Sequence, residues 1–174
     1  MKIIVCKDYA EVSAKATELF VAQINQKADS VIGLATGSTP LGLYAGMAQA
    51  NAEGKVDFSK VQSFNLDEYY PIDETHDQSY RYFMNKNLFD RVNIDKNRTF
   101  VPNGLAADPA AEGEAYDNHI KELGGIDIQL LGIGLDGHIG FNEPDSFFTK
   151  ETHLVKLHES TIEANSRFFA SLRS

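Results

Sequence analysis

The chain has 174 residues, of which 43% are hydrophobic and 24% charged; this composition is typical of one globular domain and excludes a largely disordered chain. The formal net charge of −9 argues against general binding to nucleic acid or to an anionic membrane, although a few local donors can still hold a small anion. No apolar run approaches the length of a membrane helix, and the single cysteine, Cys6, fits a reducing cytoplasm.

Strands and helices are expected to alternate along the sequence. Short apolar or β-branched runs predict strands at residues 2–6, 31–35, 61–65, 99–101, 126–131 and 153–157. Asp8 is a predicted N-cap, with Glu11 in the capping-box position, and Val12, Ala16, Leu19, Phe20 and Ile24 form one apolar helix face. Further helices are predicted at residues 41–52, 79–89, 109–123 and 162–169.

This alternation predicts an α/β fold with parallel strands and right-handed crossovers. The strand at residues 126–131 is the most apolar, so we expect it to lie centrally in the sheet. Ligands of such sheets bind beyond the carboxyl ends of the strands. Three polar clusters follow predicted strands at that edge, and this convergence indicates a functional site.

The first cluster is Thr36-Gly37-Ser38-Thr39-Pro40, between a buried strand and a helix start. Its backbone N–H groups, its hydroxyls and the helix dipole together suit an anion, so we interpret it as a phosphate-binding loop. An ordinary Ser/Thr helix cap is the alternative. No lysine of the Walker type follows, which disfavours a nucleotide-hydrolysing P-loop.

The second cluster is the segment FNLDEY, in which Asp67 and Glu68 follow a strand. Two carboxylates at a strand end can act as a general base and a neighbour that tunes it. Apolar Phe64 and Leu66 would desolvate Asp67 and raise its pKa toward useful basicity. A solvated acidic turn is the alternative.

The third cluster, GIGLDGHIGFNEP at residues 132–144, combines four glycines with Asp136, His138, Asn142 and Glu143. Histidine is suited to proton transfer near neutral pH, and a carboxylate could orient its ring. A structural loop is one alternative. A dinucleotide fingerprint is disfavoured because this segment is unlike a helix start, and a metal site because the spacing matches no zinc signature.

A fourth feature is the segment NSRFF, in which Arg167 lies between a polar and an aromatic pair. The guanidinium group could hold a phosphate bidentately, or it could lie on the surface of an amphipathic helix.

Taken together, the segments TGSTP, FNLDEY, GIGLDGHIGFNEP and NSRFF, in this order, resemble the glucosamine-6-phosphate deaminase family from residue 2 to about residue 169. The resemblance implies a three-layer α/β/α sandwich around a mainly parallel, Rossmann-like sheet. It implies the conversion of glucosamine 6-phosphate and water to fructose 6-phosphate and ammonia, with no cofactor and no metal.

The same resemblance implies the roles of individual residues. His138 would open the sugar ring, assisted by Asp136 and Glu143. Asp67 would move a proton from C2 to C1 through an enol-type intermediate. The phosphate would be held by residues of two segments: Thr36, Gly37, Ser38, Thr39 and Arg167.

Members of the family continue beyond the equivalent of Ser174, so residues 1–174 are expected to form one phosphosugar isomerase/deaminase domain that lacks the family's C-terminal portion. We expect such a sheet to expose apolar surface or an unpaired edge, which favours self-association. The expected partner is the small-molecule substrate, with no nucleic acid and no membrane. A phosphosugar-binding protein without catalysis and a 6-phosphogluconolactonase-like hydrolase are the alternative functions.

Overall fold

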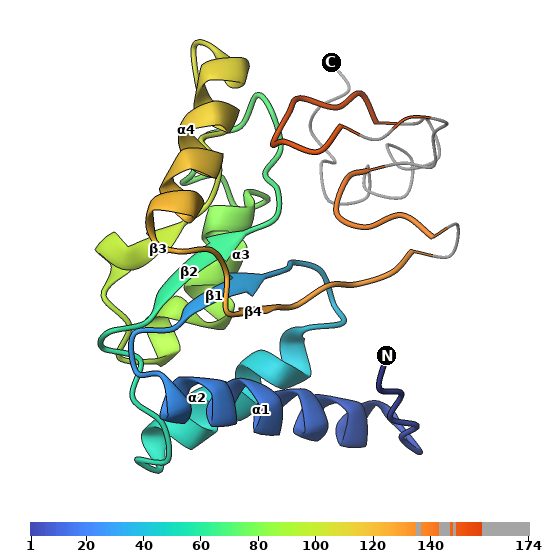
Figure 1. Ribbon diagram of the computed structural model, residues 1–174, viewed down its shortest axis with the longest axis vertical. Helices are drawn as coiled ribbons and strands as arrows, with labels where there is room; N and C mark the ends of the chain where they lie inside the picture. Colours follow the sequence, from blue (N-terminus) through green and yellow to red (C-terminus); the bar gives the residue numbers. More distant parts are fainter. Residues whose placement is uncertain (135–136, 143–146, 148, 158–174) are drawn as a thin grey trace.

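The computed structural model describes residues 1–134, 137–142, 147 and 149–157. Within them, one parallel sheet has the strand order β3-β2-β1-β4 (Figure 1). The strands are β1 (Val31–Leu34), β2 (Gln62–Asn65), β3 (Thr99–Phe100) and β4 (Ile128–Gln129). The helices are α1 (Tyr9–Gln26), α2 (Leu41–Ala52), α3 (Tyr80–Asn87) and α4 (Pro109–Glu122), with short 3-10 turns η1 (Phe89–Arg91) and η2 (Lys96–Arg98).

Side-chain caps set the starts of three of these helices. The Asp8 carboxylate accepts a hydrogen bond from the Glu11 backbone N–H at 2.9 Å, which confirms the predicted N-cap of α1. The Ser79 hydroxyl accepts from the Tyr82 N–H at 2.9 Å at the start of α3. Asp108 caps α4 in the same way. Each cap satisfies a backbone donor that lacks a partner within its own helix.

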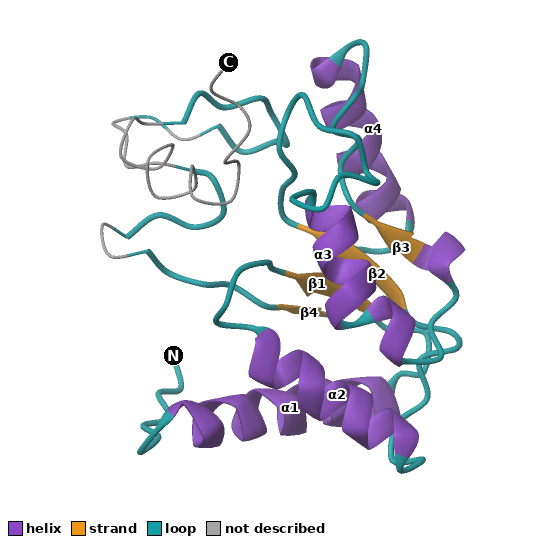
Figure 2. Ribbon diagram, turned by 180° about the vertical axis from the view of Figure 1, so that it is seen from behind, coloured by secondary structure: helices purple, strands orange, loops and turns teal. Residues whose placement is uncertain are grey.

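The helices cover both faces of the sheet, which confirms the three-layer α/β/α architecture (Figure 2). On one face, Ile32 and Leu34 of β1 belong to a buried apolar cluster with side chains of α1, α2 and α3. On the other face, the Phe64 ring contacts Tyr116 and His119 of α4, with ring centroids 5.4 and 5.3 Å apart. Burial of these two clusters is the main stabilisation of the fold.

Several predicted elements are absent or differently placed. Residues 2–6 form no strand, and Ile3 and Val5 are 73% and 89% exposed. An apolar run becomes a strand only beside a hydrogen-bonding neighbour, and no described strand pairs with this segment. Residues 153–157 are likewise irregular, and the predicted helix at 162–169 lies outside the described residues.

The prediction that residues 126–131 lie centrally is wrong for the described sheet. β4 covers only two residues there and has β1 as its one neighbour, so it is an edge strand. Leu131 and Ile133, which follow it, are 50% and 80% exposed. Among the described residues, this part of the chain therefore exposes apolar side chains beside an edge strand.

The predicted apolar face of α1 is only partly buried. Phe20 and Ile24 are in the core, whereas Val12 and Leu19 are about half exposed. The first half of α1 contacts α2 through the small side chain of Ser13, because α2 presents glycines there. Close backbone approach thus replaces apolar packing in this half.

Candidate active site

Three loops meet the same edge of the sheet, because all four described strands are parallel (Figure 1). β1 leads into residues 36–40, β2 into residues 66–70, and β4 into the long loop that begins at residue 130. The sequence predicted this convergence, and the carboxyl edge of a parallel sheet is the usual place for a ligand.

The loop at residues 36–40 has the features of an anion site. Gly37 has a φ of 99°, a left-handed conformation that favours glycine, and residues 37–39 are exposed. The N-cap of α2 is Pro40, and neither Ser38 nor Thr39 caps this helix with its side chain. The alternative of an ordinary Ser/Thr cap is therefore wrong. Within the described residues, the hydroxyls of Ser38 and Thr39 and the N–H groups of residues 37–39 have no hydrogen-bond partner.

Asp67 is the ionisable side chain whose environment best suits a base. Burial is the main reason that its pKa rises to about 7, and the negative charge of Glu68 adds to the rise. A carboxylate with a pKa near the working pH can both take up and return a proton. The alternative of a solvated acidic turn is thus wrong for Asp67.

Glu68 is held in a different environment from Asp67. Its carboxylate accepts hydrogen bonds from the backbone N–H groups of Tyr69, Tyr80 and Arg81 at 2.9, 2.8 and 3.0 Å. Burial raises the pKa of Glu68, while these N–H groups oppose the rise. Glu68 thereby fixes the start of α3 beside the site, a structural role that the sequence analysis missed.

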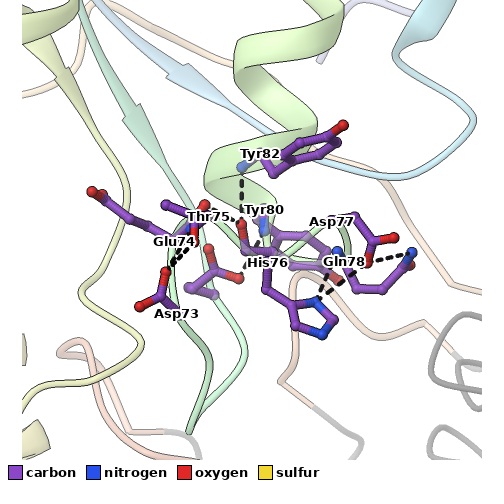
Figure 3. A network of polar contacts seen from close by, with 10 residues as sticks. Asp73, Glu74, Thr75, His76, Asp77, Gln78, Tyr80 and Tyr82 are labelled. Carbon is purple, nitrogen blue, oxygen red and sulfur yellow. Dashed lines mark hydrogen bonds and ion pairs between the residues drawn. The ribbon is translucent and has the colours of Figure 1, made fainter. Parts of the chain in front are cut away.

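A polar network in the preceding turn supports the same helix start (Figure 3). Asp73 accepts hydrogen bonds from the Thr75 N–H and hydroxyl at 2.8 and 2.6 Å. The Ser79 hydroxyl donates to the Glu74 carbonyl at 2.8 Å while it caps α3. These hydrogen bonds give partners to the Thr75 N–H and the Glu74 carbonyl in the loop that leads into Tyr80.

Tyr80 links the loops and was not predicted as a site residue. Its ring contacts Tyr69, with centroids 4.8 Å apart, and stacks with Phe141 at 5.7 Å. Burial raises the pKa of Tyr80, the nearby Asp67 charge adds to the rise, and a side-chain hydrogen bond to Thr36 opposes it. The phenol therefore stays protonated near neutral pH and can donate a hydrogen bond at the site.

The long loop approaches Asp67 through Gly140. Gly140 has a φ of 60°, and a Cβ atom there would lie 3.2 Å from the Asp67 Oδ2. A tight turn closes nearby, since the Gly134 N–H donates to the His138 carbonyl at 2.9 Å. The His138 ring lies against Gly134, where any Cβ would overlap it. A larger residue at Gly134 or Gly140 would therefore crowd a predicted site residue, His138 or Asp67 respectively.

A cavity of about 360 Å³ opens beside Asp67. Its lining also includes Tyr69, Phe141, Asn142 and residues of the segment 149–155. This volume falls within the range of small-molecule sites. Neither His138 nor the loop 36–40 lines it, so the cavity gives access to Asp67 without containing every predicted site residue.

Three predicted site residues, Asp136, Glu143 and Arg167, lie outside the described residues. In the described part of the chain, no group of three or more His, Cys, Asp and Glu side chains could hold a metal ion. No helix there is both long and apolar enough to cross a membrane.

The fold and the site define an α/β protein with a carboxylate of raised pKa and a loop of exposed hydrogen-bond donors at the carboxyl edge of its sheet. Residues 7–168 match the family described as glucosamine-6-phosphate isomerases/6-phosphogluconolactonase. A glucosamine-6-phosphate deaminase of Clostridium perfringens is 55% identical over 172 residues, which cover 99% of this chain and 71% of that protein. One from Clostridioides difficile is 55% identical over 98% of this chain and 69% of its own length. The chain belongs to the glucosamine-6-phosphate deaminase family, a family of enzymes.

Solved structures agree with this assignment. A monomeric glucosamine-6-phosphate deaminase is 41% identical and superposes with a TM-score of 0.94, over all of this chain and 72% of that one. The 6-phosphogluconolactonase of Plasmodium vivax is 28% identical, with a TM-score of 0.65 over 78% of this chain and 48% of its own. The chain is thus more similar to the deaminase than to the lactonase.

Proposed function

We propose that this chain catalyses the isomerising deamination of glucosamine 6-phosphate to fructose 6-phosphate and ammonia. One observation carries the proposal: a partly buried carboxylate, Asp67, has a pKa raised to about 7 at the point where three loops meet. The identity of 55% to deaminases of other organisms supports the choice of substrate.

The phosphate of the substrate would bind at residues 36–39. The N–H groups of residues 37–39 and the hydroxyls of Ser38 and Thr39 have no hydrogen-bond partner among the described residues, and at the start of α2 they supply donors for an anion. Arg167 would add a guanidinium group, on the basis of the sequence motif. Anchoring the phosphate would hold the sugar carbons at a constant distance from Asp67.

Asp67 would act as the base of the isomerisation. Its ionised carboxylate removes the proton from C2 of the open-chain amino sugar and returns it to C1. The enol-type intermediate between these steps then becomes an imine at C2, which water hydrolyses to the ketone and ammonia. A pKa of about 7 favours both the removal and the return of the proton.

Opening of the sugar ring must come before this proton transfer. We assign it to His138 as the proton carrier, with Asp136 and Glu143 orienting the ring, on the basis of the motif GLDGHIGFNEP. These groups supply the acid–base chemistry without a metal or cofactor. We further propose that residues 1–174 act as one domain in the cytoplasm, with the phosphosugar as partner.

The test is the release of ammonia and fructose 6-phosphate from glucosamine 6-phosphate by the purified chain. We expect Asp67→Asn to lose turnover while it keeps phosphosugar binding, because the amide cannot accept the proton. The matched control is Asp73→Asn, an exposed aspartate of the α3 turn, which should leave turnover unchanged. Full activity of Asp67→Asn would show that Asp67 is not the base.

The same preparation separates the alternative functions. A folded chain that binds the phosphosugar and releases no ammonia would be a binding protein without catalysis. Hydrolysis of 6-phosphogluconolactone in place of deamination would indicate the lactonase activity of the more distant relatives.

A further inference from the structure

The start of α2 receives its cap from another helix. Pro40 offers no capping side chain, yet the N–H of Gly42 donates to the Tyr9 hydroxyl oxygen at 2.8 Å. The same hydroxyl donates its proton to the Thr39 carbonyl at 2.8 Å and lies 3.4 Å from the Ser38 carbonyl. One phenol of α1 therefore joins the loop 36–40 to the first turn of α2.

Tyr9, which is 52% exposed, reaches the loop because α1 and α2 pack closely beside it. It is the first residue of α1, directly after the Asp8 cap. A Cβ atom at Gly42 would lie 2.2 Å from the Ser13 Oγ, and one at Gly46 would lie 2.3 Å from the Thr17 Oγ1. The two helices thus meet at backbone distance over one full turn, and this packing places the Tyr9 hydroxyl at the loop.

The contact also determines which way the loop presents its peptide groups. In a trans peptide, the carbonyl and the N–H point in opposite directions. With the Ser38 carbonyl near Tyr9, the N–H of Thr39 points away from α1. The carbonyl oxygens of Ser38 and Thr39, which would repel an anion, face Tyr9 of α1. The N–H of Thr39 is left to donate to a ligand.

We propose that Tyr9 is a positioning residue of the phosphosugar site, acting through the loop 36–40 without touching the ligand. This role rests on the proposed function, because it requires that the loop bind phosphate. Capping by Tyr9 also explains why the hydroxyls of Ser38 and Thr39 remain available, since neither is needed to cap α2. Replacing Tyr9 by phenylalanine removes both hydrogen bonds and keeps the ring.

The experiment compares wild type, Tyr9→Phe and Tyr82→Phe. Tyr82 is the matched control, because its hydroxyl forms no hydrogen bond with a described residue. The affinities for glucosamine 6-phosphate and for inorganic phosphate are measured by calorimetry, and the amide resonances of residues 37–42 by NMR. We expect Tyr9→Phe to weaken both ligands about tenfold, by loss of two hydrogen bonds, and Tyr82→Phe to change them less than about twofold.

A positioning role also predicts a split between the kinetic constants. KM should rise in Tyr9→Phe while kcat and the pH midpoint of turnover stay as in wild type, whereas general loosening would change all three. Unchanged ligand affinities in Tyr9→Phe, with a wild type that binds, would overturn this inference and leave the proposed function standing. Failure of wild type to bind either ligand would overturn both.

Discussion

Replacement of Asp67 by asparagine should stabilise the protein, and more so at high pH. The carboxylate has a pKa of about 7 in the folded chain and about 4 in an unfolded one. Because the folded pKa is raised, the neutral acid is favoured by folding. This contribution to stability is complete below pH 4 and is lost as the pH rises through 7.

The size of this effect on the free energy of unfolding follows from the difference between the two pKa values of Asp67. One pKa unit corresponds to about 1.4 kcal/mol, so ionised Asp67 lowers the free energy of unfolding by up to about 4 kcal/mol at pH 8. At pH 5, where the unfolded chain is already ionised and the folded one is not, the loss is about 1.4 kcal/mol. Asparagine, which stays neutral, avoids both losses.

Urea unfolding of wild type and Asp67→Asn at pH 5 and pH 8 measures the effect. The gap between the two free energies of unfolding should widen by about 2.6 kcal/mol between pH 5 and pH 8. Asp73→Asn is the control: hydrogen bonds from Thr75 lower the pKa of Asp73, so this side chain is ionised in both states at pH 5 and at pH 8, and the gap for this variant should stay constant. A gap that is constant with pH would refute the argument that burial raises the pKa of Asp67.

Four further outcomes can be checked on the same protein. Turnover should rise with pH through about 7, because Asp67 must be ionised to act as the base; a pH-independent rate would contradict this. Glu68→Gln removes a nearby negative charge, so this pH midpoint should move to lower pH in the rate profile. Tyr80→Phe should lower kcat/KM about tenfold through loss of its hydroxyl at the site, with unchanged folding by circular dichroism. Gly140→Ala should impair turnover, since its methyl group meets Asp67, whereas Gly54→Ala, also at positive φ but in open space, should affect only stability, by about 1 kcal/mol.

Local signals predicted the helices well. Capping by Asp8 depends on neighbours in the sequence, and α2 has the predicted bounds. The strands β1 and β2 were also predicted, because continuous apolar runs between turn residues suit a buried parallel sheet. The loop at 36–40 and Asp67 were found for the same reason, since each follows such a strand.

Contacts between distant segments account for the errors and omissions. Residues 2–6 have strand-like composition without a strand beside them, and composition alone cannot supply that neighbour. Glu68 binds the N-terminus of a helix that begins 12 residues later, so the sequence suggested a pair of similar carboxylates where the structure has one with a pKa raised to about 7 and one that caps a helix. Tyr80 was predicted on a helix face, and only the tertiary fold places its ring against Phe141.

The hydrogen bonds of Tyr9 have a consequence for the order in which the site can form. They join residues only 30 and 33 positions apart, within the continuous segment that contains α1, β1 and α2. The contact between Asp67 and Gly140 instead requires the chain to close a much longer loop, which costs more entropy. The loop at residues 36–40 is therefore fixed by contacts within one local segment of the chain. The surroundings of Asp67, by contrast, are complete only after the long loop has returned to the sheet.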